Sequence, residues 1–180
     1  MKNLKNKVIA ITGGATGIGF ALAKTLGSEG AKIVIGEPRK EKLIKAVDDL
    51  KDMGIEAFEA YLDVTDLKSV EDFAEFTIKC FGRVDMLINN AGIAGARGRI
   101  DKVDVVEAKK IFDVNFFGVW HGCAVFSKKM IEQGTKSAIY NLGSENSLFI
   151  AVPKSVAYVA SKHSVFALSE SLRNDLPDFI

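Results

Sequence analysis

The chain has 180 residues, of which 48% are hydrophobic and 26% are charged, and its formal net charge is +1. This composition is typical of one globular domain over residues 1–180, and it excludes a disordered or fibrous chain. The near-zero net charge argues against nucleic acid as a partner, because non-specific affinity for phosphates needs an excess of Lys and Arg.

The first half of the chain alternates short apolar runs with amphipathic stretches. Residues 8–12 and 33–35 are compact apolar runs that predict buried strands. Residues 55–62 predict a third strand, and the charges of Glu56 and Glu59 suit the edge of a sheet. Apolar residues that recur every three or four positions predict the two intervening helices; they are Ile18, Leu22, Leu26, Leu43, Val47 and Leu50.

The second half continues the same alternation. Thr65 or Asp66 is suited to cap a helix over 67–81, which carries an apolar stripe. Asp104, with an acidic residue three positions later, is typical of a helix start. The remaining predicted elements are a strand at 84–88, a long helix at 104–130, a strand at 138–142 and a final helix at 157–176.

This succession of strands and helices predicts an α/β fold, because the connections are long enough for parallel pairing. Right-handed crossovers would give a doubly wound parallel sheet with helices on both faces. Ligands of such sheets bind beyond the carboxyl ends of the strands. We therefore expect the functional site near the turn that follows residues 8–12.

Cysteines and histidines are few. We interpret Cys80 and Cys123 as free thiols in a reducing compartment, which indicates a cytoplasmic location. His121 and His163 occur without a Cys-x-x-Cys pair, so the sequence has no recognisable zinc spacing and we expect no metal. The uncharged stretch 8–23 is interrupted by glycines, and we expect no membrane attachment.

A glycine-rich turn, TGGATGIG at residues 12–19, joins the first strand to the first helix. Glycine allows positive φ and lets phosphates approach the backbone, and the following helix offers free N–H groups. A pyrophosphate fits this description. A tight turn without any ligand is the alternative, since the full G-x-G-x-x-G pattern is absent and Leu22 occupies its last position.

Glu37 follows the second predicted strand, where an acidic residue can hold the adenosine ribose. Its carboxylate would accept hydrogen bonds from both ribose hydroxyls and would repel a 2′-phosphate, which predicts NAD rather than NADP. The nearby cations of Arg39 and Lys40 could instead accommodate that phosphate. A solvated Glu37 at a helix start, before Pro38, is the structural alternative.

Tyr158 and Lys162 are four residues apart in the final predicted helix and so share one face. An ammonium beside a phenol favours the phenolate, and the pair can then transfer a proton near neutral pH. Two fixed residues also arise by chance, so an ordinary surface pair is the alternative.

Together these features resemble the short-chain dehydrogenase/reductase family over essentially the whole chain. The standard type fits, because Thr16 stands where the extended type has glycine. The segments 63–64 and 89–92 (NNAG) resemble the family's adenine-contacting pair and its motif after the fourth strand. The cofactor-binding positions are then Gly13, Gly17, Ile18, Gly19, Glu37, Asp63, Val64, Asn89, Gly92, Tyr158 and Lys162.

The resemblance implies hydride transfer between NAD(H) and a secondary alcohol or ketone, with NADP as the less favoured cofactor. Tyr158 would accept or donate the hydroxyl proton. Lys162 would lower the pKa of Tyr158 and hold the nicotinamide ribose. Asn115 would support a proton-relay water near Lys162. A cofactor-binding protein without catalysis is the alternative function.

The fourth catalytic residue of the family is a serine after the fifth strand. We assign it to Ser144, which precedes Tyr158 by one residue more than the spacing common in the family. A one-residue insertion in the loop would explain this. Ser147 is the alternative, although it lies too close to Tyr158 for the usual pattern.

Members of the family continue beyond the Tyr–Lys helix with further strands. We therefore expect a sheet that lacks its C-terminal strands and leaves strand 138–142 as an open edge. The family commonly pairs the long helices after the fourth and fifth strands, which predicts a homodimer or homotetramer. Phenylalanines that would supply such a surface, or else the core, are Phe112, Phe116, Phe117, Phe126 and Phe166.

Overall fold

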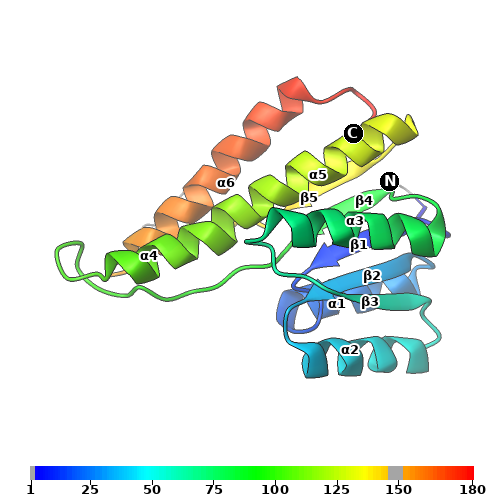
Figure 1. The fold of residues 1–180 in the computed structure, drawn as a ribbon, viewed down its shortest axis with the longest axis horizontal. Coiled ribbons are helices and arrows are strands. Elements are labelled where there is room, and N and C mark those ends of the chain that lie inside the picture. Colours follow the sequence, from blue (N-terminus) through cyan, green and yellow to red (C-terminus); the bar gives the residue numbers. More distant parts are fainter. Residues whose placement is uncertain (1–2, 146–151) are drawn as a thin grey trace.

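The structure is a computed structural model that describes residues 3–145 and 152–180, and it contains one sheet flanked by helices (Figure 1). The strands are β1 (Val8–Thr12), β2 (Lys32–Glu37), β3 (Ala57–Tyr61), β4 (Met86–Asn89) and β5 (Ala138–Asn141). The helices are α1 (Gly17–Ser28), α2 (Lys40–Asp52), α3 (Leu67–Phe81), α4 (Val105–Phe112), α5 (Gly118–Gln133) and α6 (Val156–Asp175), with a π-helical turn, η1 (Asp113–Phe117), between α4 and α5.

The strands pair in the order β3-β2-β1-β4-β5, and every pair is parallel. The chain order reverses between β1 and β4, so the carboxyl ends of these two strands meet at a switch point. β3 lies at one edge, as Glu56 and Glu59 predicted, and β5 lies at the other edge of the described sheet. The predicted doubly wound α/β fold is confirmed.

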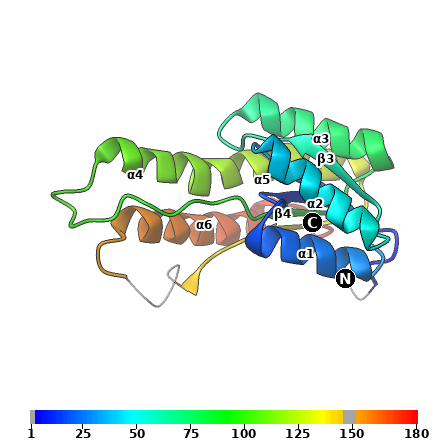
Figure 2. The ribbon, with the colours of Figure 1, turned by 90° about the horizontal axis from the view of Figure 1, so that it is seen from below.

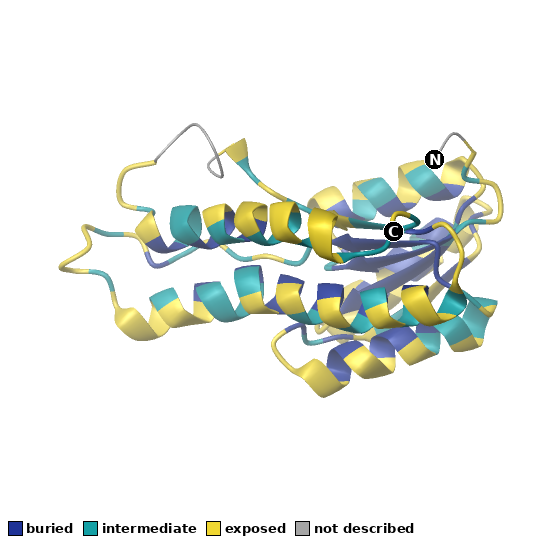
Figure 3. Cartoon of the chain, turned by 90° about the horizontal axis from the view of Figure 1, so that it is seen from above, coloured by how far each residue is buried: buried dark blue, intermediate teal, exposed yellow. Residues whose placement is uncertain are grey.

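Two apolar cores hold helices against opposite faces of the sheet (Figure 2). On one face, Ile33 of β2 and Leu50 of α2 belong to the same buried cluster. On the other face, Phe73 of α3 and Phe126 of α5 pack with their ring centroids 5.9 Å apart. All residues of β1 and β4 are buried, whereas the outer sides of the helices are exposed (Figure 3).

The long helix predicted over 104–130 is interrupted by the π turn of η1, which the apolar pattern did not reveal. Asp104 caps its start as expected, because its carboxylate accepts from the N–H of Val106 at 2.8 Å. The wider turn places Asn115 in the interior, where it is 0% exposed. Single π turns of this kind are frequent at functional sites.

The cap of α3 and the two thiols can also be compared with their predictions. Of the two candidate caps, Asp66 accepts from the N–H of Lys68 at 3.0 Å. Cys80 and Cys123 are free, as predicted. Burial raises the pKa of the Cys123 thiol to about 11. Within residues 3–145 and 152–180, no helix has both the length and the apolar character needed to cross a membrane.

Candidate active site

The glycine turn lies at the switch point, between the end of β1 and the first turn of α1. Gly17 has a φ of +55°, which disfavours other residues, and a Cβ built there would meet no atom within 4 Å. At Gly19 a Cβ would overlap the carbonyl oxygen of Gly13. No side chain therefore covers the start of α1 at Gly17. The N–H groups and the dipole of the helix favour a phosphate there.

Asn90 and Thr12 lock this turn against the end of β4. The side-chain amide of Asn90 donates to the carbonyl oxygens of Thr12 and Gly13, at 2.9 and 3.0 Å. The hydroxyl of Thr12 accepts from the N–H groups of Asn90 and Ala91, each at 3.0 Å. The sequence assignment named Asn89 but not Asn90. Adjacent residues of a strand point to opposite sides, which is the signal that could have separated them.

Asn89 itself is 2% exposed and points away from the glycine turn. Its amide nitrogen donates to the Oδ1 of Asn141 on β5 at 2.9 Å. Asn141 in turn donates to the Oγ of Ser169 on α6 at 2.9 Å. Asn89 therefore connects β4 to β5 and α6, and any effect of its side chain on the cofactor cleft would pass through these elements.

Glu37 lies at the carboxyl end of β2 and is 2% exposed. Its carboxylate is held by Arg39, whose Nε and Nη2 donate to the two oxygens at 2.5 and 3.0 Å. The same guanidinium reaches the hydroxyl of Thr16 in the glycine turn at 3.4 Å. The hydrogen bond to Glu37 raises the pKa of Arg39, so the guanidinium stays charged. The sequence suggested the two residues but not this ion pair.

Asp63 and Val64 follow β3 and face the same region. The carboxylate of Asp63 accepts from the N–H and the hydroxyl of Thr65, at 3.0 and 2.8 Å. The carbonyl oxygen of Val64 accepts from Nδ1 of His121 on α5 at 2.9 Å. A Cβ at Gly118 would collide with Val64, so α5 passes very close to this segment. Helix α5 thus fixes the place of Val64.

These segments enclose a cavity of about 450 Å³, a typical size for a cofactor or small-ligand site. Its lining residues are Gly13, Thr16, Glu37, Pro38, Arg39, Leu62, Asp63, Val64, Ala91, Gly92, Ile93 and Val114. The cavity therefore combines part of the glycine turn, the ion pair of Glu37 and Arg39, the carboxylate of Asp63 and an apolar wall. A diphosphate, a ribose and an adenine ring have the corresponding chemistry.

Tyr158 and Lys162 lie one turn apart on α6, as predicted. Lys162 is only 5% exposed, and its Nζ donates to the carbonyl oxygen of Leu142, just after β5, at 2.7 Å. Burial lowers the pKa of Lys162. A Cβ built at Gly92 would lie 3.9 Å from this Nζ, so the ammonium group stands beside the lining of the cavity.

Asn115 ties the cavity wall to α6. Its amide accepts from the N–H of Ile93 at 2.8 Å and donates to the carbonyl of Ile93 at 2.9 Å. The amide nitrogen also lies 3.3 Å from the Oγ of Ser161, which donates to the carbonyl of Tyr158 at 2.8 Å. The sequence indicated Asn115 but not this anchoring of the Ile93 backbone.

Of the two candidate catalytic serines, Ser144 lies among the described residues. Ser144 follows β5, in the region expected from the sequence, and is half-buried. Ser147 lies outside the described residues. Within 3–145 and 152–180, no group of three or more His, Cys, Asp and Glu residues is placed to hold a metal ion.

The chain is similar in sequence to known proteins. A family profile described as short chain dehydrogenase matches residues 7–179. The 1-deoxy-11-beta-hydroxypentalenate dehydrogenase of Streptomyces avermitilis is 32% identical over 175 residues, covering 97% of this chain and 64% of that protein. An uncharacterized oxidoreductase of Bacillus subtilis is 34% identical, with 98% of this chain and 49% of that protein covered. The chain thus spans about half to two-thirds of these relatives.

Two solved structures share the fold and contain nicotinamide cofactors. A short-chain dehydrogenase/reductase from Burkholderia phymatum, in complex with NAD, has a TM-score of 0.93 and 35% identity, with 98% of this chain and 62% of that chain covered. A gluconate 5-dehydrogenase from Burkholderia cenocepacia, in complex with NADP and tartrate, has a TM-score of 0.89 and 31% identity, with 96% and 67% covered.

Proposed function

The chain belongs to the short-chain dehydrogenase family, and from this premise we propose that it transfers a hydride between NAD(H) and a secondary alcohol or ketone. One observation carries the proposal: the cavity has a glycine turn and Glu37 along it and the buried Lys162 ammonium beside it. Tyr158 stands one turn away from that ammonium on α6. The cavity proposed for the cofactor therefore lies next to the residues proposed to transfer the proton.

The nicotinamide, when bound, supplies the hydride acceptor for oxidation and the hydride donor for reduction. In oxidation, Tyr158 takes the hydroxyl proton of the alcohol while the carbinol carbon loses its hydride, and a C=O bond forms. In reduction, Tyr158 returns that proton to the oxygen. Lys162 places a positive charge one helical turn from Tyr158 and would hold the nicotinamide ribose. Asn115 supports a proton-relay water near Lys162. Ser144 donates to the substrate oxygen as charge develops there.

We assign NAD as the preferred cofactor because of Glu37. A carboxylate accepts hydrogen bonds from both ribose hydroxyls and repels a 2′-phosphate. The ion pair with Arg39 tempers this preference, since the guanidinium lies beside the same carboxylate. The family has solved members with NAD and with NADP, so the choice depends on this pair of residues.

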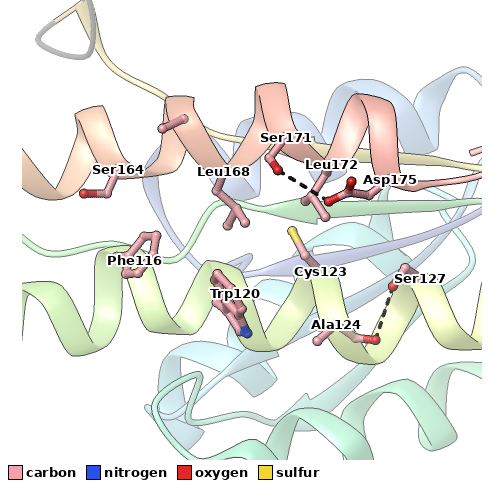
Figure 4. A pocket seen from close by; sticks show the side chains of 11 residues that line it. Phe116, Trp120, Cys123, Ala124, Ser127, Ser164, Leu168, Ser171, Leu172 and Asp175 are labelled. Carbon is pink, nitrogen blue, oxygen red and sulfur yellow. Dashed lines mark hydrogen bonds between the residues drawn. The ribbon is translucent and has the colours of Figure 1, made fainter.

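We further propose that two copies associate through α5 and α6. A groove of about 460 Å³ runs between these helices, and Figure 4 shows Phe116, Trp120 and Leu168 along it. Trp120 is 50% exposed, and Phe117 and Phe166 are also exposed. Phe126, in contrast, is fully buried in the core of the monomer. The cytoplasmic location remains a proposal that rests on the two free thiols.

The decisive experiment replaces Tyr158 by Phe. We expect Tyr158→Phe to abolish NADH-dependent reduction of a panel of ketones, because the proton donor is lost. NADH binding, followed by fluorescence titration, should stay nearly unchanged, since the ring and its packing remain. Exposed Tyr140→Phe on β5 is the matched control and should retain activity. Turnover that survives in Tyr158→Phe would reject the proposed role.

A further inference from the structure

A third hollow lies beside the start of α6. It is formed by residues 97–99, in the loop after β4, and by residues 152–155, and its volume is about 490 Å³. The N–H of Gly98 donates to the carbonyl oxygen of Lys154 at 3.0 Å, and Gly98 and Ser155 form a parallel bridge. Figure 2 shows the loop before α4 and the start of α6 at the same end of the molecule.

The charged side chains that line this hollow are all cationic. Arg97 and Lys154 are exposed, and across residues 3–145 and 152–180 their side chains have no hydrogen bond or ion pair. Arg99 is different, because its Nε and Nη2 donate to the carboxylate of Asp101 at 2.5 and 2.7 Å. Among the described residues, the charges of Arg97 and Lys154 therefore have no counterion at the hollow.

The backbone around the hollow adopts unfavourable conformations. Ala96 has a φ of +46° and Lys154 a φ of +61°, both in the left-handed region that non-glycine residues avoid. Such conformations persist only where the surrounding structure fixes them, and they gather at ligand-binding segments. Here the bond from Gly98 to Lys154 holds the second residue in place.

The hollow adjoins the proposed reaction site. Ser155 precedes Tyr158 by three residues, roughly one helical turn or about 4.5 Å along the axis. Ala96 and Ala157 pack in one buried cluster, which fixes the loop against the helix turn that carries Tyr158. The loop itself starts at Gly92, beside Lys162. The lining of the hollow and Tyr158 are therefore held within about one helical turn of each other.

We propose that the substrate carries an anionic group, a carboxylate or a phosphate, which Arg97 and Lys154 bind while the reacting carbon lies at Tyr158. The planar fork of an Arg side chain matches both anions, and Lys adds a mobile point charge. The anion would stand several bonds from the alcohol carbon, because Lys154 precedes Tyr158 by four residues. The role in substrate binding rests on the proposed function; anion binding itself does not.

Anion binding is measured without turnover, from the backbone amide resonances of the whole chain. The probes are succinate and glycerol phosphate, with dimethyl succinate and glycerol as uncharged counterparts. We expect shifts confined to the amides of residues 97–99, 152, 154 and 155, and only with the anions. The probe that binds more tightly shows whether the site prefers a carboxylate or a phosphate. Arg97→Ala combined with Lys154→Ala should weaken binding about tenfold. Lys102→Ala, exposed in the same loop but outside the hollow, is the control.

Three results would overturn the inference: an unchanged affinity in the double variant, shifts elsewhere, or no shift up to the solubility of the probe. The amide spectrum of each variant verifies that it is folded. NADH is titrated separately into the same samples. Failure of NADH binding would count against the proposed function alone, whereas NADH binding with failed anion binding would count against this inference alone.

Discussion

At the scale of single residues, we expect the ion pair between Glu37 and Arg39 to set the cofactor preference. We expect Glu37→Gln to shift the preference from NADH toward NADPH by about tenfold, since the freed guanidinium can take the 2′-phosphate. Arg39→Ala should instead sharpen the preference for NADH, because only the repelling carboxylate remains. Both ratios are measured by fluorescence titration. An unaltered ratio in Glu37→Gln would remove Glu37 from the ribose site.

The proposed catalytic role of Ser144 can be tested by a matched pair of variants. Removing a donor to a developing oxyanion costs about 10²–10³ in kcat, so we expect a loss of this size in Ser144→Ala. NADH affinity should be unaffected. Ser147→Ala should keep most of the activity. The reverse outcome would transfer the assignment to Ser147 and would mean that the loop carries no insertion.

The positions of the candidate residues in the fold were largely predictable, but their hydrogen-bond partners were not. The end of a strand and a four-residue spacing placed Glu37, Tyr158 and Lys162 in the correct elements. Arg39 forms an ion pair with the carboxylate of Glu37, and Asn115 forms hydrogen bonds with the backbone of Ile93. Both contacts depend on how the chain folds in three dimensions. A pattern along one chain does not contain such contacts.

At the scale of elements, close packing of α5 on β4 is the vulnerable contact. A Cβ at Gly122 would overlap the amide of Asn89, whose Oδ1 is buried without a hydrogen-bond partner in the described structure. We expect Gly122→Ala to lower the free energy of unfolding by about 1–3 kcal/mol, measured by urea denaturation. Lys128→Ala, on the exposed side of α5, should change it little. Equal stability of both variants would show that α5 shifts freely.

Element order and type followed from apolar periodicity, because buried strands and helix stripes leave direct traces in the sequence. The break of the long helix at η1 could not be predicted from apolar periodicity. A π turn takes up one extra residue, while apolar residues continue through it. Its cause is tertiary: the turn brings Asn115 inward to the backbone of Ile93. Glycines in α5 give an indirect signal of the same closeness, as Gly118 and Gly122 both lie against neighbouring segments.

At the scale of the whole molecule, one end of the central strands carries the candidate site and the other end carries a stabilising ion-pair cluster. The carboxyl ends of β1 and β4 form the candidate site, whereas Asp85 ties their amino ends together. Its carboxylate is 0% exposed and accepts from Lys7, from Arg83 and from the N–H of Val8. Burial raises the pKa of Asp85, but these hydrogen bonds outweigh it and leave the pKa below its ordinary value.

The direction of the Asp85 pKa shift determines how the stability of the fold depends on pH. A carboxyl group whose pKa is lower in the folded state stabilises the fold above its unfolded pKa, near 4, and the contribution disappears as pH falls through the folded value. Asp85→Asn should therefore cost about 2 kcal/mol at neutral pH, a low value for a buried pair because Lys7 and Arg83 are partly exposed. Urea denaturation at neutral and acidic pH should show the difference shrinking below about pH 4. A difference that stays constant with pH would assign the effect to packing rather than to the charge of Asp85.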